Sequence, residues 1–280
     1  MTLKIGTRKS RLAVIQAEAA AAAIKDKFPD IRTELVYITT EGDRVSDKPL
    51  TVIGGRGVFV SEIENALLEG RIDIAVHSAK DMAVKCADGL AVTGVLERGS
   101  PFDLLISVKG RKHGNVFGTG SPRRKKVIEK LFPDAEIKGI RGNIDTRLNK
   151  LRSGEYDSIV LAEVGIKRLG ADMSDLSVME LKYGPCSPCQ GIIALETAES
   201  GYAADTAKAV SHEDTFLCFE TERYAMKLMG ADCTKPVGAY AVIKNGMTEL
   251  SITFDGVHTL HGEAPVSDRF GLAERLVSEL

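Results

Sequence analysis

The sequence predicts an α/β fold of three domains, and this prediction depends on two patterns of predicted helices and strands along the chain. Up to about residue 165, short runs rich in β-branched residues alternate with longer segments whose apolar residues recur at helical spacing. This alternation is typical of βαβ units with a mainly parallel sheet. From His212 onward the order becomes a helix, three strands and a second helix, which predicts a small α+β domain.

The first α/β set occupies the N-terminal third of the chain. Ser10 is a suitable helix N-cap, because it precedes an Ala-rich run that ends at Phe28. The glycines between Gly54 and Gly57 are expected to open a second helix. The predicted strands cover residues 3–6, 32–40, 73–77 and 90–95, and the predicted helices cover residues 10–28 and 58–69.

A second α/β set follows a crossing segment at residues 97–103. Pro122 suits the first position of a helix, and Ile144, Leu148 and Leu151 recur at the spacing of a buried helical stripe. The predicted strands cover residues 103–108, 115–118, 136–140 and 158–162, and the helices cover 121–132 and 143–151. Further strands are predicted at residues 191–195, 237–243, 249–254 and 258–262.

Composition limits the classes of function that the chain can serve. Of the 280 residues, 44% are apolar, so we expect a large hydrophobic core. The formal net charge is -2, so the protein as a whole is not attracted to nucleic acid or to an anionic membrane. Aromatic residues make up 5% and Trp is absent, which disfavours base stacking. No stretch is long and apolar enough to span a bilayer, and the first residues do not resemble a secretory signal, so we expect a cytoplasmic protein with reduced cysteines.

Positive charge is concentrated in one part of the second set. Residues 118–152 contain ten basic and four acidic side chains, a local net charge of +6. Three turns from a strand into a helix, at residues 7–10, 119–124 and 141–147, combine helix N-termini with Arg side chains. Because guanidinium groups bind carboxylates or phosphates bidentately, these turns predict a polyanionic ligand in a crevice between the two α/β domains.

One acid and three thiols are further candidates for chemistry. Lys80 and Asp81 follow the strand at residues 73–77; Asp81 is either a turn residue or a carboxylate that stabilises a cation in the crevice. His77 is interpreted as a structural histidine. Cys233 lies on a predicted loop, where a thiol serves as an anchor or nucleophile only if its motif supports that role. Cys186 and Cys189 form a single C-x-x-C pair, which does not predict a metal site. The pair is interpreted as part of a hinge strand, with a redox role as the alternative.

Ten short blocks, in order along the chain, complete the pattern. They include Val76-His-Ser-Ala-Lys-Asp81 and Gly118-Thr-Gly-Ser-Pro-Arg-Arg124, and they cover residues 6–13, 54–59, 73–81, 118–124, 140–148, 154–157, 168–170, 190–191, 222–223 and 233–241. With these blocks the chain resembles the hydroxymethylbilane synthase family, also called porphobilinogen deaminases. The resemblance implies a transferase that joins four porphobilinogen molecules head to tail, with loss of ammonia, to give the linear tetrapyrrole hydroxymethylbilane.

The resemblance also implies a cofactor and a set of site residues. Cys233 would carry a dipyrromethane through a thioether, and Asp81 would be the catalytic carboxylate. Each pyrrole ring carries an acetate and a propionate, which basic and hydroxyl side chains would bind. These cofactor- and substrate-binding residues would be Arg8, Ser10, Gln16, Ser78, Lys80, Thr119, Ser121, Arg123, Arg124, Arg141, Arg147 and Arg168.

The resemblance further implies the domain boundaries. Two periplasmic-binding-protein-like α/β domains, residues 1–96 with 190–209 and residues 97–189, would surround the crevice, and residues 210–280 would form the α+β domain. Three positions differ from residues that are common in the family. Gly120 stands where Ser is common, Arg56 stands where Lys is common, and Ser61 stands where some members have Lys. The segment from Cys186 to Cys189 replaces the usual Ala and Gly, and its spacing suggests sensitivity to oxidation.

Two alternatives remain at this point. Two α/β domains around an anion crevice also describe solute-binding proteins, although the thiol block at Cys233 disfavours that class. A degenerate paralogue that holds a tetrapyrrole without making one is the other alternative. For the transferase we expect a monomer whose partner is the small-molecule substrate porphobilinogen, with no metal, nucleic acid or membrane partner.

Overall fold

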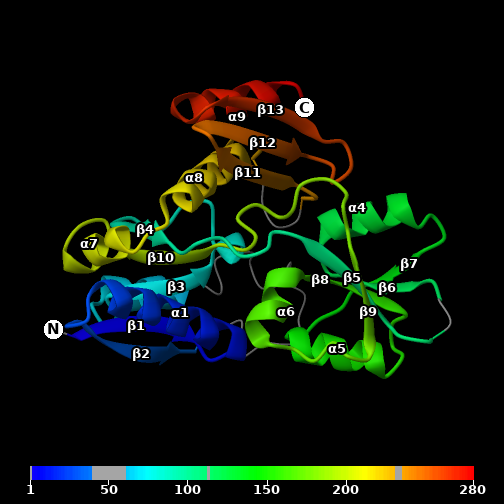
Figure 1. Ribbon diagram of the computed structural model, residues 1–280, viewed down its shortest axis with the longest axis horizontal. Coiled ribbons are helices and arrows are strands. Elements are labelled where there is room, and N and C mark those ends of the chain that lie inside the picture. The colour runs from blue at the N-terminus through cyan, green and yellow to red at the C-terminus, as the bar shows by residue number, and fades with distance from the viewer. Residues whose placement is uncertain (1, 40–60, 112–113, 231–234) are drawn as a thin grey trace. The chain divides into compact units, whose positions relative to one another are not determined.

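The computed structural model describes residues 2–39, 61–111, 114–230 and 235–280 of the chain (Figure 1). The chain divides into two compact units, Met1–Gly99 with Gly191–Glu220 and Ser100–Gln190 with Thr221–Leu280. Each unit is described by itself below. The boundaries of three domains remain a prediction, because the small C-terminal sheet is grouped here with the second unit.

The first unit is built on a five-stranded sheet. Its strand order is β2 (Arg32–Ile38), β1 (Thr2–Arg8), β3 (Ile74–Ser78), β10 (Ile193–Ala198) and β4 (Leu90–Val95). Strand β1 is parallel to β2 and β3, whereas β10 is antiparallel to both of its neighbours. The strand predicted near residues 191–195 is therefore confirmed, and it returns from late in the chain to fill the fourth position of the sheet.

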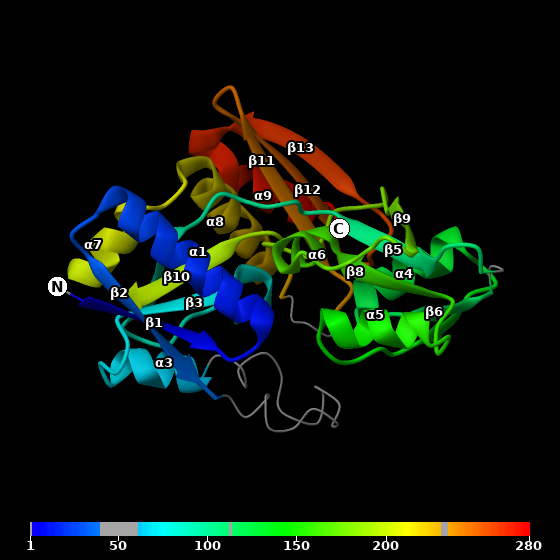
Figure 2. The same cartoon turned by 60° about the horizontal axis from the view of Figure 1, so that its bottom comes forward.

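Helices cover both faces of this sheet (Figure 2). Helix α1 (Arg11–Lys27) packs on the face that carries Ile74 and Val76, and its buried alanines allow a close approach to the strands. Helix α3 (Ser61–Leu68) packs with Ala75 on the opposite face. Helix α7 (Tyr202–Ala209) follows β10 and completes the unit, and α8 (Glu213–Leu228) contains the boundary between the units.

The second unit repeats this arrangement of strands. Its order is β7 (Glu136–Lys138), β6 (Val116–Gly118), β8 (Ser158–Ala162), β5 (Asp103–Val108) and β9 (Leu176–Glu180). Strand β6 is parallel to β7 and β8, and β5 is antiparallel to β8 and β9. Both large sheets thus place an antiparallel strand fourth, which confirms the predicted α/β class.

Three helices follow the parallel strands of the second unit. They are α4 (Pro122–Leu131), α5 (Ile144–Arg152) and α6 (Glu163–Leu169). Pro122 begins α4, and Leu148 and Leu151 lie in the core, as the sequence predicts. Helix α6 and strand β9 are additions that the sequence pattern does not reveal, because each has seven or fewer residues and β9 leaves Val178 and Met179 exposed.

A small antiparallel sheet completes the second unit. It consists of β11 (Gly238–Lys244), β12 (Met247–Thr253) and β13 (Leu260–Pro265), and helix α9 (Arg269–Ser278) packs on β12 and β13. Asn245 and Gly246 form the β11–β12 turn with φ of 51° and 73°, as a two-residue type I′ hairpin requires. The predicted order of one helix, three strands and one helix is confirmed. No helix among the described residues is long and apolar enough to cross a membrane.

Candidate functional site

In the first unit, the predicted site residues gather at the carboxyl ends of β1 and β3. These strands are adjacent and parallel, so Arg8 and Ser78 lie at the same edge of the sheet. Ser10 caps α1 by accepting a hydrogen bond from the Ala13 N–H at 3.4 Å. Gln16 is buried and its Nε2 lies 2.8 Å from the Ser78 hydroxyl. The structure therefore brings Arg8, Ser10, Gln16 and Ser78 to one edge.

Asp81 ends a short 3-10 turn, Ala79–Asp81, that leaves β3 at this edge. The Ala79 N–H donates to the Ile192 carbonyl at 3.0 Å, and the Ala79 side chain is buried. The base of the turn is thus held against the neighbouring strand. Lys80 is half-buried and Asp81 is exposed, so the Asp81 carboxylate is available to a ligand at the edge of this sheet.

His77 lies beneath this turn as a buried structural histidine. Its Nε2 lies 2.9 Å from Oε2 of Glu196 on β10, and both side chains are buried. Burial raises the pKa of Glu196, but the hydrogen bond and charge of His77 outweigh it, so the pKa of Glu196 lies below its ordinary value. The pair joins β3 to β10, two residues before the turn that ends at Asp81 begins.

In the second unit, the turn from β6 into α4 has the geometry that the sequence predicts. The Ser121 hydroxyl caps α4 by accepting from the Arg124 N–H at 3.4 Å, and the buried Thr119 hydroxyl accepts from the Ser121 N–H at 3.2 Å. These bonds hold the backbone so that Arg123 and Arg124 lie in the first turn of the helix. Both guanidinium groups point into the unit rather than into solvent, since Arg123 is 5% and Arg124 9% exposed.

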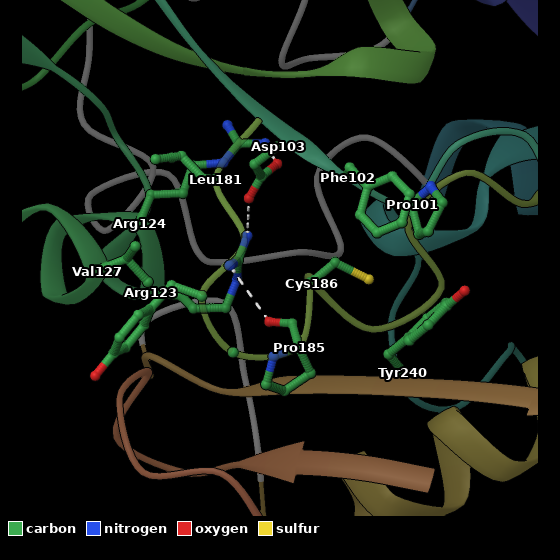
Figure 3. Close-up of a pocket in the computed structure, with 12 residues that line it drawn as sticks. Pro101, Phe102, Asp103, Arg123, Arg124, Val127, Leu181, Pro185, Cys186 and Tyr240 are labelled. Carbon is green, nitrogen blue, oxygen red and sulfur yellow. Dashed lines mark hydrogen bonds and ion pairs between the residues drawn. The ribbon is translucent and has the colours of Figure 1, made fainter. Parts of the chain in front are cut away.

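The two guanidinium groups bind one buried carboxylate, that of Asp103 at the start of β5 (Figure 3). Arg124 donates to Asp103 Oδ1 at 2.7 Å, and Arg123 donates to Oδ2. Burial raises the pKa of a carboxyl group, but the charges of Arg124 and Arg123 outweigh it and hold the pKa of Asp103 well below its ordinary value. Gln190 Nε2 also donates to Asp103 Oδ1, at 2.9 Å.

A cavity of about 50 Å³, room for a few water molecules, lies beside this cluster (Figure 3). Two guanidinium groups against one carboxylate leave a net positive charge at its wall. The Nε atoms of Arg123 and Arg124 are buried with no hydrogen-bond partner in the described part of the chain. The lining residues are Pro101, Phe102, Asp103, Arg123, Arg124, Val127, Leu181, Tyr183, Gly184, Pro185, Cys186 and Tyr240.

The remaining predicted arginines of this unit follow the strands next to β6. Arg141 is exposed after β7, and Arg147 on α5 donates from Nε to the Gly142 carbonyl at 2.7 Å. Arg168 lies on α6, which follows β8, and burial lowers its pKa to about 10. Its guanidinium is therefore charged at neutral pH. The parallel strands β7, β6 and β8 thus deliver five arginines to the carboxyl-end side of one sheet.

Two residues of the cluster are absent from the predicted binding set. Strand β5 begins with Asp-Leu-Leu-Ile, in which Asp103 is the only charged residue among buried apolar ones. A single charge in such a run indicates a buried ion pair. Gln190 lies in the family block at residues 190–191, but nothing in its local sequence predicts that its side chain binds Asp103. Cys233, the predicted attachment point, and Arg56 lie outside the described residues, so the structure describes neither. No group of acidic, His or Cys side chains among the described residues has the arrangement of a metal site.

Comparison with known proteins identifies relatives along nearly the whole chain. Residues 3–206 match the family model described as porphobilinogen deaminase, dipyrromethane cofactor binding domain. The porphobilinogen deaminase of Lachnospira eligens is 41% identical over 263 residues, which cover 91% of this chain and 89% of that protein. That of Burkholderia ambifaria is 36% identical over 100% of this chain and 89% of its own length. A probable porphobilinogen deaminase of Methanosarcina barkeri is 40% identical over 94% of this chain and 84% of its own length. With this agreement over both units, the chain belongs to the porphobilinogen deaminase family.

Proposed function

We propose that the protein is a hydroxymethylbilane synthase, which joins four porphobilinogen molecules head to tail with loss of ammonia and releases the linear tetrapyrrole. The observation that carries the proposal is the exposed Asp81 carboxylate at the carboxyl end of β3, in a chain of this family. We place the reaction in the cytoplasm, with a monomeric enzyme and a small-molecule substrate. The formal net charge of -2 supports the absence of a nucleic-acid partner.

The described residues of the second unit fit a dipyrromethane with its carboxylate side chains. The Arg123–Arg124–Asp103 cluster has a net positive charge and two unused Nε–H donors, and Arg141, Arg147 and Arg168 follow neighbouring strands. When bound through Cys233, the group supplies the pyrrole to which new units are joined. Thr119 and Ser121 hold the backbone that presents two of the arginines.

Asp81 is proposed to act on the reacting ring. Its carboxylate accepts hydrogen bonds from pyrrole N–H groups and stabilises the positive charge that develops on the substrate as ammonia leaves. An exposed carboxylate performs this task better than one that two buried guanidinium groups already neutralise, as they do Asp103. Lys80, in the same turn, is proposed to bind a substrate carboxylate.

The arginines are proposed to bind the substrate's acetate and propionate groups. Arg168 retains its charge at neutral pH despite its lowered pKa, because neutral pH lies well below about 10. Arg147 is oriented by the hydrogen bond that its Nε donates to the Gly142 carbonyl. Each added pyrrole brings two more carboxylates, so several guanidinium groups are needed as the product lengthens.

The test is tetrapyrrole release by the full-length protein incubated with porphobilinogen. Wild-type protein is expected to turn over, Cys233→Ser to lose both bound pyrrole and turnover, and the matched Cys86→Ser control to retain both. Normal tetrapyrrole formation by Cys233→Ser would contradict the proposed attachment point. Saturable binding of porphobilinogen by wild-type protein without any product would instead favour a degenerate paralogue or an anion-binding protein.

A further inference from the structure

Cys189 occupies a backbone conformation that its side chain does not favour. Residues 187–190 form a turn in which the Gln190 N–H donates to the Ser187 carbonyl at 3.0 Å. Pro188 holds the second position and Cys189, with φ of 60°, the third, which makes this a type II turn. That third position is normally Gly. The only other described non-Gly residue with positive φ is Asn245, which tolerates that region. Local backbone preference therefore does not explain a cysteine at this position.

The two thiols of the C-x-x-C pair have complementary surroundings. Cys189 is buried, and its N–H donates to Glu222 Oε2 at 2.5 Å. Cys186 is half-buried and lines the cavity of about 50 Å³, where its sulfur lies among Phe102 and Tyr240 (Figure 3). A molecule little larger than water therefore has room to reach Cys186. Among the described residues, neither cysteine takes part in a disulfide.

The pair is connected at both ends to the Arg–Asp cluster. On its N-terminal side, the Pro185 carbonyl accepts from Arg123 at 3.4 Å. On its C-terminal side, Gln190 Nε2 donates to Asp103 Oδ1 at 2.9 Å and to the Pro101 carbonyl at 2.7 Å. A covalent bond that draws the two cysteines together therefore displaces groups that hold Asp103 and its two arginines.

We propose that Cys186 and Cys189 form a redox-active dithiol whose oxidation by a small peroxide disturbs the Arg123–Arg124–Asp103 cluster. The Cys186 thiol attacks a peroxide oxygen, the O–O bond breaks, and one water leaves as Cys186 becomes a sulfenic acid. The Cys189 thiol then attacks that sulfur, an S–S bond forms, and a second water leaves. Two thiols and one hydrogen peroxide thus give one disulfide and two waters, and a dithiol reductant reverses the change.

Peptide mapping tests the dithiol independently of the proposed function. The reduced full-length protein is treated with hydrogen peroxide, unreacted thiols are blocked with N-ethylmaleimide, and the protein is digested with trypsin. Residues 183–208 form one tryptic peptide that contains both cysteines and no other cysteine. We expect this peptide to carry no label after peroxide and two labels after subsequent reduction. Two labels without reduction, or sulfinic acid at Cys186 in place of a disulfide, would overturn the proposal.

Variants test the effect on the cluster. Cys189→Gly removes the second thiol and places the favoured residue in the left-handed position, so it is expected to fold, to keep its basal turnover and to resist peroxide. Wild-type protein and the Cys86→Ser control are expected to lose turnover about tenfold on oxidation, as for one hydrogen bond to a charged group, and to recover on reduction. An equal loss in Cys189→Gly, or an unchanged turnover in wild-type protein with the disulfide formed, would overturn the proposed coupling. If no protein turns over, the peptide result still stands and the proposed function alone fails.

Discussion

Asp81 and Asp103 both lie at the end of a strand, but one side chain is exposed and the other is buried. Asp81, in the first unit, is exposed at the end of a short turn after β3. Asp103, in the second unit, is 5% exposed and binds Arg123, Arg124 and Gln190. A carboxylate whose lone pairs are occupied by buried donors holds a scaffold together, whereas an exposed carboxylate is available to substrate. This contrast supports the proposal that Asp81 acts on the substrate, whereas Asp103 holds Arg123 and Arg124 in position.

The largest expected effect is on turnover and concerns Asp81. Asp81→Asn removes the negative charge and keeps the shape, so we expect turnover to fall by about 10²–10⁴-fold. The free energy of unfolding should change by less than about 0.5 kcal/mol, because the side chain is exposed. Steady-state kinetics and urea denaturation measure the two quantities. Asp88→Asn, an exposed aspartate of the same unit that pairs with Lys85, is the control and should behave as wild type in both.

Asp103 is expected to show the reverse pattern, with stability as the main readout. Asp103→Ala leaves two buried guanidinium groups without their shared carboxylate, so we expect a loss of about 3–5 kcal/mol in the free energy of unfolding. Denaturant titration of the variant and of wild-type protein gives the difference. A loss below about 1 kcal/mol would mean that solvent or another anion already satisfies the two arginines, and the contrast with Asp81 would fail.

The pH dependence of stability sharpens the same contrast. Because the pKa of folded Asp103 lies below its unfolded value of 3.8, its ionised form contributes stability that is present above about pH 4. That contribution is lost as the pH falls further, toward the folded pKa. The difference in stability between wild-type protein and Asp103→Asn should therefore be constant from pH 7 to about 5 and shrink below about 4. A difference that instead grows on acidification has the wrong sign for this ion pair.

The smallest expected effects come from the two matched helix caps. Ser10 caps α1 in the first unit and Ser121 caps α4 in the second. In each cap the serine hydroxyl oxygen lies 3.4 Å from the backbone nitrogen that donates to it. Ser10→Ala and Ser121→Ala should each lower the free energy of unfolding by about 1 kcal/mol. Denaturation of both variants at neutral pH measures these losses. If only one variant is destabilised, the two turns are less alike than their hydrogen bonds indicate.

The sequence predicts those parts of the fold that depend on local pattern. The strands of both large sheets other than β9, the N-cap Ser10 and the first helical position of Pro122 are confirmed, because each depends on residues a few positions apart. The Asn245–Gly246 hairpin turn is equally local in origin. By contrast, α6 and β9 are too short and too exposed on one side for periodicity to reveal them.

The arrangement within the site depends on contacts that are distant in sequence. Asp103 lies 20 and 21 positions from Arg123 and Arg124, and 87 from Gln190. Charge counting over residues 118–152 predicts an anion site but does not reveal that a buried aspartate from β5 already binds two of the arginines. The structure therefore divides the predicted binding arginines of the second unit into a buried pair, Arg123 and Arg124, and three that are half-buried or exposed, Arg141, Arg147 and Arg168.

The most direct test of the account is the intact mass of the purified full-length protein, followed by mapping of its Cys233 peptide. Trypsin releases this cysteine within residues 228–244, separate from Cys186, Cys189 and Cys218. The account predicts a covalent excess of two linked pyrrole units on that peptide, retained in Asp81→Asn. An unmodified Cys233 peptide, in protein that also fails to acquire the adduct when supplied with porphobilinogen, would contradict the proposed cofactor attachment and the reaction that depends on it.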